Sequence, residues 1–263
     1  MKNKYFFTML FLVASIGLFA QVDHTKTTVW KSEVEANWIQ TPDDTLSWTR
    51  GTPWITQKTV FNVPTMGDCH VVSDTAVCGQ LVLGDNSNMG GKLIIKDGGV
   101  LTSGAEGSTS WTGVSYNRSA HMVVEAGGTF ISNHRMHVGM LAAGADTMHS
   151  ILEVAGTVNV TSNVFSIDHN GWTGKTAEVW IKPGGVLMAP NFRMGTNAKM
   201  DVAGGLVIIK GVRDSILNAY KTDGRLTGEE GFEPPTITVH YGWDTVTVIS
   251  TSTSEDYVGV NDR

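Results

Sequence analysis

Several classes of protein are excluded by what this sequence of 263 residues has little of. It contains 2 cysteines, which is too few for a disulfide-dense scaffold. Its 19 basic residues are outnumbered by 25 acidic ones, and the formal net charge of -6 argues against a nucleic-acid partner, because phosphate binding requires a basic surface. After the N-terminal segment, no apolar run is long enough to cross a membrane, so we expect no membrane span in the mature protein.

Familiar catalytic motifs are also missing. The sequence has no nucleophile elbow, no glycine loop of the phosphate-binding type and no CxxC pair. Apart from a short stretch at 213–221, no segment has the periodicity of a helix, which argues strongly against an α/β fold. Hydrophobic residues make up 41% of the chain, enough for a packed core, so global disorder is excluded.

Residues 1–20 are predicted to be a secretory signal peptide rather than part of the fold. A positively charged start is followed by an apolar run over 5–19 and a small residue at a plausible cleavage point. We therefore expect the protein to be secreted or periplasmic. Cys69 and Cys78 lie close together in this exported chain, so a disulfide between them and two buried thiols are both compatible with the sequence.

The strongest signal is an internal repeat marked by glycines. Each copy has a short strand with alternating apolar residues, a Gly or Gly-Gly corner and a second apolar strand, and a third strand follows most corners. The copies lie at 92–101, 121–130, 151–158, 178–187 and 199–206, with corners at Gly98, Gly127, Gly156, Gly184 and Gly204. Because one coil cannot bury its apolar face alone, this repeat predicts an all-β fold, a right-handed parallel β-helix of about six stacked coils. The alternative is an ordinary β-sandwich.

The segments that flank the repeat differ from it in composition. Residues 21–67 have no Gly-Gly corner but contain Trp30, Trp38, Trp48 and Trp54, and we interpret them as a cap on the N-terminal end of the β-helix at 68–210. Four tryptophans would alternatively suit a surface that stacks on sugars. Residues 211–263 are predicted to hold closing strands within 237–249 and a loose polar tail.

At this point the chain resembles a known group of proteins. The sequence Val63-Pro-Thr-Met-Gly-Asp68, followed by Val71-Val72, looks like the entry to the first coil of secreted right-handed β-helix proteins of Bacteroidota, the pectin-lyase-like superfold. The Gly-Gly-Val-Leu repeats look like their body. The resemblance spans roughly residues 60–210 and is specific for the fold. It implies a polysaccharide lyase, a glycosidase, an esterase or a non-catalytic adhesin.

Alternation along the third strands predicts a cluster of polar residues on one outward face. Leu83, Val114, Val138, Ile167 and Met194 should point inward, so their neighbours should point outward. The resulting outward cluster consists of Trp111, Tyr116, Arg135, His137, Asp168, His169, Asn191 and Arg193. A solvated polar face is the alternative, since outward surfaces are polar by default and a shift of one residue would exchange the two faces.

This cluster suggests cleavage of an acidic polysaccharide by β-elimination. His137 would remove the C5 proton, while Arg135 and Arg193 would bind the uronate carboxylate. Tyr116 would donate a proton to the leaving oxygen. The remaining residues, Asp168, His169, Asn191 and Trp111, would bind the substrate. A non-catalytic β-helix that binds carbohydrate is the competing hypothesis.

A second candidate lies on the first strand of each coil. Glu153, Trp180 and Asp201 should face outward on successive coils, which places the two carboxylates roughly 9–10 Å apart. That separation is near the upper range for an inverting glycoside hydrolase, and Trp180 would stack on a sugar ring. A solvated or salt-bridged column that includes Lys182 is the alternative.

A metal site is a weaker hypothesis. His134, His137, Asp168 and His169 carry ligand atoms suited to zinc, but His134 and His137 have opposite parity on an extended strand and should face apart. Calcium is conceivable at Asp85-Asn86, although no calcium motif is present. We therefore expect no metal or other cofactor, and a polysaccharide as the partner.

Overall fold

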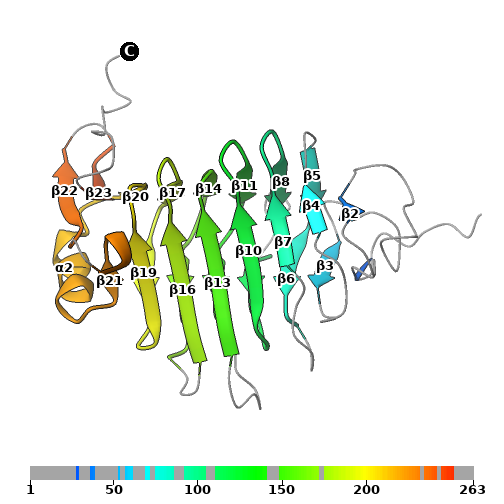
Figure 1. Cartoon of the computed structure of the whole chain (residues 1–263), viewed down its shortest axis with the longest axis horizontal. Helices are drawn as coiled ribbons and strands as arrows, with labels where there is room; N and C mark the ends of the chain where they lie inside the picture. Colours follow the sequence, from blue (N-terminus) through cyan, green and yellow to red (C-terminus); the bar gives the residue numbers. More distant parts are fainter. Residues whose placement is uncertain are drawn as a thin grey trace, which may run out of the picture.

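The computed structural model shows a parallel β-helix in which short strands stack side by side along one long axis (Figure 1). The structure describes residues 28–29, 36–38, 53, 57–61, 69–71, 75–85, 92–104, 110–140, 148–171, 175–231, 234–241 and 244–251. The predicted signal peptide, the polar tail and three of the four N-terminal tryptophans lie outside these residues. The fold class predicted from the repeat is confirmed.

The strands form three sheets, which we number I to III. Sheet I contains β1 (Thr28–Val29), β3 (Lys58–Phe61), β6 (Gln80–Leu83), β9 (Thr112–Val114), β12 (Met136–Val138), β15 (Phe165–Ile167) and β18 (Phe192–Met194). Sheet II contains β2 (Ala36–Asn37), β4 (Cys69–Val71), β7 (Lys92–Ile95), β10 (Ala120–Val124), β13 (Met148–Val154), β16 (Lys175–Ile181), β19 (Ala198–Val202) and β21 (Leu226–Thr227). Sheet III contains β5 (Thr75–Cys78), β8 (Val100–Ser103), β11 (Thr129–Ser132), β14 (Thr157–Val160), β17 (Val186–Ala189), β20 (Leu206–Lys210), β23 (Val246–Ser250) and β22 (Thr236–His240).

The chain visits the sheets in the order I, II, III, and it completes this circuit five times between β6 and β20. Strands β3, β4 and β5 form a further circuit before these. Parallel strands already occur before residue 68, because β3, from the segment predicted to be a cap, pairs in parallel with β1 and with β6.

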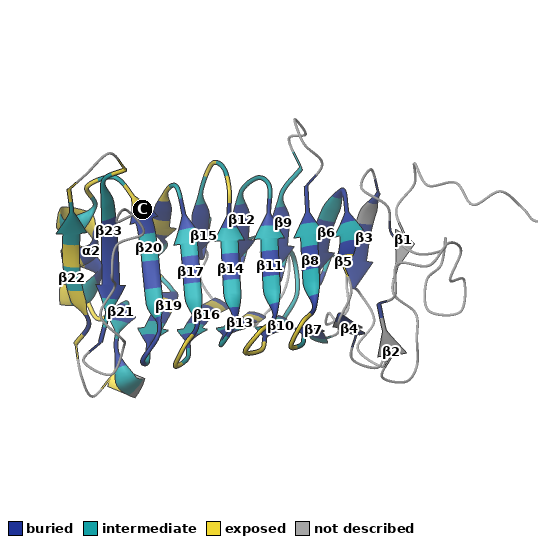
Figure 2. Cartoon of the chain, turned by 90° about the horizontal axis from the view of Figure 1, so that it is seen from above, coloured by how far each residue is buried: buried dark blue, intermediate teal, exposed yellow. Residues whose placement is uncertain are grey.

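The C-terminal end of the stack is closed by a different arrangement. Strand β23 pairs antiparallel with β20, and β22 pairs antiparallel with β23, which confirms the predicted closing strands. The helix α2 (Asp214–Thr222) lies at the same end, where it buries Leu217 and Tyr220 (Figure 2). It is followed by β21 and the 3-10 helix η1 (Glu229–Gly231). No helix of the described residues combines the length and the apolar character needed to cross a bilayer.

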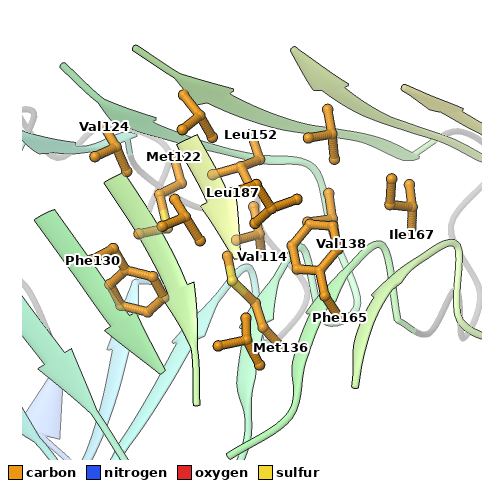
Figure 3. Packing of buried hydrophobic residues seen from close by; sticks show 14 of the residues in the cluster. Val114, Met122, Val124, Phe130, Met136, Val138, Leu152, Phe165, Ile167 and Leu187 are labelled. Atoms are coloured by element: carbon orange, nitrogen blue, oxygen red, sulfur yellow. The ribbon is translucent and has the colours of Figure 1, made fainter. Parts of the chain in front are cut away.

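The core lies inside the coils and consists of columns of apolar side chains. Val114, Val138 and Ile167 follow one another on successive strands of sheet I and are all 0% exposed (Figure 3). Phe165 stacks on Phe192 of the next coil at a ring distance of 6.0 Å. Each such side chain contributes roughly 1.5–3 kcal/mol when it leaves water. The inward parity predicted for the third strands is therefore confirmed.

The glycine corners have two distinct physical causes. Gly127 has a φ of 80°, a left-handed conformation that glycine adopts without strain. Its neighbour Gly128 is required for space, because a Cβ there would lie 2.6 Å from the carbonyl oxygen of Ile95 in the preceding coil. Gly156 belongs to the second kind, since its Cβ would lie 2.3 Å from the carbonyl oxygen of Glu125. Backbone turning alone therefore does not explain the repeat.

Trp38, Phe61 and both cysteines are part of the core. Trp38 is 0% exposed and lies 6.5 Å from the ring of Phe61, so it does not belong to a sugar-stacking surface. Cys69 and Cys78 are both buried and are not joined by a disulfide, so the disulfide that the sequence left open is not formed. Burial raises the pKa of the Cys78 thiol to about 12.

Candidate functional site

The outer face of sheet I carries the row of positions predicted from strand parity. His137 lies between the inward-facing Met136 and Val138 of β12. In the parallel register it stands beside Gly113 on one side and Ser166 on the other, and Ser166 stands beside Arg193. The sequence therefore placed His137 and Arg193 on the correct side of the sheet.

Two aromatic side chains cover one end of this row. The ring of Trp111 lies over Gly113, where a Cβ atom would come within 2.6 Å of its Cζ3. Tyr116 packs against the same ring at a centroid distance of 4.8 Å. Both side chains are partly exposed. The absence of a side chain at residue 113 thus allows an aromatic surface to lie flat on the sheet.

His137 is on the predicted face, but the expectation that it meets solvent is wrong. The residue is 0% exposed. Its Nδ1 forms a hydrogen bond with Oγ of Ser166 at 2.5 Å, and its ring lies 4.4 Å from that of His169 and 6.4 Å from that of Trp111. Its Nε2 has no hydrogen-bond partner among the described residues. Large neighbours on both sides bury a side chain that parity alone places outside.

The electrostatics of the row follow from this burial. Desolvation, aided by the neighbouring charges of His169 and Arg135, lowers the pKa of His137 to about 3. Desolvation and then Arg193 lower the pKa of His169 as well. His137 is therefore neutral at pH 7. The positive charge of the face resides on Arg135, which is partly exposed, and Arg193, which is exposed.

Asp168 does not belong to the outward cluster, contrary to the prediction. It is 0% exposed, and its Oδ1 lies 2.9 Å from Nζ of the equally buried Lys175. The backbone N–H of Asn197 donates a hydrogen bond to Oδ2 at 2.9 Å. The reason is that β15 ends at Ile167 and residue 168 has a φ of 54°, so the alternation of the strand no longer applies. The sequence reasoning did not consider Lys175, whose buried ammonium group is the partner of the Asp168 carboxylate.

Asn191 lies at the edge of the same face and is tied into the framework. Its Nδ2 donates to the carbonyl oxygen of Asn163 at 2.9 Å, and its Oδ1 accepts a hydrogen bond from Nη2 of Arg213 at 2.5 Å. These two hydrogen bonds connect Asn191 to the preceding coil and to the segment after β20. The structure thus brings together Trp111, Tyr116, Arg135, His137, His169 and Arg193, and it separates Asp168 from them.

The second candidate column has the predicted register. Glu153 stands beside Trp180, and Trp180 stands beside Asp201. Glu153 is held by His121, whose Nε2 lies 2.7 Å from its Oε1, and Nζ of Lys182 lies 4.3 Å from the centroid of the Trp180 ring. For Glu153 the structure therefore matches the salt-bridged alternative.

The four residues considered as metal ligands do not form a site. The structure brings the rings of His137 and His169 together, whereas Asp168 is buried against Lys175. Among the residues that can be described, no group of three or more His, Cys, Asp or Glu side chains is arranged to hold a metal ion. Asn86, from the calcium hypothesis, lies outside the described residues.

Comparison of the chain with protein-family models, with curated proteins and with solved structures finds no match in any of the three.

Proposed function

We propose that the protein binds an acidic polysaccharide on the outer face of sheet I. The observation that supports this proposal is the combination of the Trp111–Tyr116 pair, at 4.8 Å, with Arg193, which stands beside Ser166 in the same row, and with Arg135, whose charge acts on His137. Guanidinium groups form paired, charge-assisted hydrogen bonds with carboxylates and sulfates. Aromatic rings offer an apolar surface to the C–H face of a sugar.

Binding without cleavage is the version that the geometry favours. A lyase must bring its base to the C5 proton of the substrate. His137 is 0% exposed, and its Nε2 is enclosed by neighbouring atoms. The protein therefore fits a carbohydrate-binding β-helix better than an enzyme that uses this histidine.

Lyase-type cleavage is the second candidate function. One observation favours it: His137 is unprotonated at neutral pH, the form that a general base requires, although the burial that lowers its pKa to about 3 makes it a weak base while it stays covered. In this version a shift of the neighbouring rings would expose His137, and Tyr116 would supply the proton for the leaving oxygen. Both versions need export, which the predicted signal peptide over residues 1–20 would provide, because the polysaccharide is extracellular.

Affinity electrophoresis in gels that contain pectate, alginate or a sulfated glycosaminoglycan tests the proposal. We expect retardation that weakens with salt, because screening reduces the attraction between guanidinium and polyanion. The variant Arg193→Ala should weaken binding about tenfold, the effect of roughly one charge-assisted hydrogen bond. Lys210→Ala is the matched control, because Lys210 is an exposed cation on sheet III, away from this face.

Ultraviolet absorbance of the unsaturated product separates the two versions. Binding without any absorbance change supports the carbohydrate-binding protein, whereas an increase that disappears in His137→Ala supports the lyase. Equal retardation of the wild type, Arg193→Ala and Lys210→Ala would contradict both versions, since the face of sheet I would then contribute nothing.

A further inference from the structure

A separate cleft lies on the outer face of sheet II, at the C-terminal end of the stack. Its volume is about 420 Å³. Strands β16 and β19 line it with Glu178, Trp180, Lys199 and Asp201, β21 lines it with Thr227, and the turn after α2 lines it with Gly224. The volume falls within the range of about 300–1,000 Å³ that is typical of small-ligand sites.

Strand register explains why these side chains meet. Glu178 pairs with Lys199, and Trp180 pairs with Asp201, so the four outward side chains form a compact group on two adjacent strands. Thr227 continues the second row, because β21 pairs in parallel with β19 at Asp201. The lining also includes Gly224, where no side chain narrows the cleft.

The polar groups in the cleft are only partly engaged with one another. Nε1 of Trp180 donates to Oε2 of Glu178 at 3.2 Å, and the hydroxyl of Thr227 donates to Oδ2 of Asp201 at 2.9 Å. Oδ1 of Asp201 is screened from solvent and has no hydrogen-bond partner among the described residues. Lys199 is exposed. The cleft thus offers an aromatic ring, an acceptor in need of a donor and a free ammonium group.

We propose that this cleft binds one pyranose unit of a neutral oligosaccharide. The sugar ring would lie against the Trp180 ring beside Lys182, a hydroxyl would donate to the carboxylate of Asp201, and a second hydroxyl would accept from Nζ of Lys199. An uncharged sugar fits best, because the carboxylates of Glu178 and Asp201 are balanced by Lys199 and by Lys182, whose Nζ lies 4.3 Å from the centroid of the Trp180 ring, so no net positive charge is present to attract a uronate. This ligand differs from the acidic polysaccharide of sheet I, so the two sites can be tested independently.

A metal ion is a poorer occupant of the same cleft. Lys199 lines it beside the two carboxylates, and a neighbouring ammonium opposes the binding of a cation. The pair Glu153 and Asp201, considered from the sequence as hydrolase carboxylates, is not assembled here either. Glu153 is absent from the lining of the cleft and is engaged with His121.

Isothermal titration calorimetry with neutral oligosaccharides, such as cello-, xylo- and manno-oligosaccharides, tests this inference. We expect binding of at least one series by the full chain. Trp180→Ala should weaken it at least tenfold, in line with the loss of an aromatic contact and its buried area. Asp201→Asn should weaken it less, because the amide keeps one oxygen acceptor. Tyr241→Ala is the matched control, since Tyr241 is an aromatic residue that is 78% exposed and belongs to neither proposed site, and it should leave neutral-sugar binding unchanged.

The converse measurement distinguishes this site from the proposed function. Retardation in acidic gels should depend on Arg193 and not on Trp180. If the protein is not retarded in gels that contain acidic polysaccharides but still binds neutral sugars, the proposed function is refuted and the inference about the cleft is retained. The inference is overturned if no neutral series binds, or if Trp180→Ala binds as the wild type does. Should Trp180→Ala fail to fold, Lys199→Ala replaces it, because Lys199 is exposed and its loss creates no cavity.

Discussion

The buried state of His137 predicts a specific dependence of stability on pH. An unfolded chain protonates this imidazole below its ordinary pKa of 6.5, whereas the folded chain protonates it only near pH 3. Between these values the unfolded state binds more protons, so the free energy of unfolding falls as the pH falls. Stabilisation is complete above pH 6.5 and is lost progressively toward pH 3.

The magnitude follows from the same two values. The pKa of His137 falls from 6.5 in the unfolded chain to about 3 in the folded chain, and at about 1.4 kcal/mol per pKa unit this limits the pH-dependent loss of unfolding free energy to about 5 kcal/mol. At pH 5 the loss relative to pH 8 is about 2 kcal/mol. That is a large part of the total stability of a typical domain, which is about 5–15 kcal/mol. Urea unfolding, followed by circular dichroism at several pH values, measures it.

The variant His137→Gln isolates the effect, because glutamine does not titrate. The difference in unfolding free energy between wild type and variant should change by about 2 kcal/mol between pH 8 and pH 5. His169→Gln is the comparison variant, and it should change the pH dependence less, because His169 is only partly buried. Parallel pH profiles for the wild type and His137→Gln would refute the buried placement of His137.

Other predictions concern the framework. Lys175→Met should destabilise the fold by about 3–5 kcal/mol, because it leaves the carboxylate of Asp168 buried without its cation, and adding Asp168→Asn should recover part of the loss. Gly185→Ala should lower the free energy of unfolding more than Gly184→Ala in a urea titration. A Cβ at residue 185 would lie 2.1 Å from a carbonyl oxygen, whereas a Cβ at residue 184 would meet open space and only the smaller strain of a φ of 76° would remain. Neither Cys69 nor Cys78 is in a disulfide and both are buried, so their thiols should react with a thiol reagent only after unfolding.

Strand parity predicted the site only as far as the strands extend. His137 and Arg193 were assigned to the outer face correctly because each lies inside a three-residue strand between inward-facing neighbours. Asp168 was misplaced because it follows its strand in a left-handed conformation, which turns the side chain toward the interior. The solvent exposure of His137 could not be predicted from strand parity, because the residues that bury it belong to neighbouring coils.

The sequence by itself determined the periodic features of this protein: the parallel stack, the inward columns and the register that aligns Glu153, Trp180 and Asp201. These follow from a repeat of alternating strands and glycine corners, which is local information. Only the tertiary structure decided that Asp168 pairs with Lys175, that His137 is covered and that a cleft opens beside Trp180. Each of these depends on which side chains meet across coils and at the closed end, and no single segment carries that information.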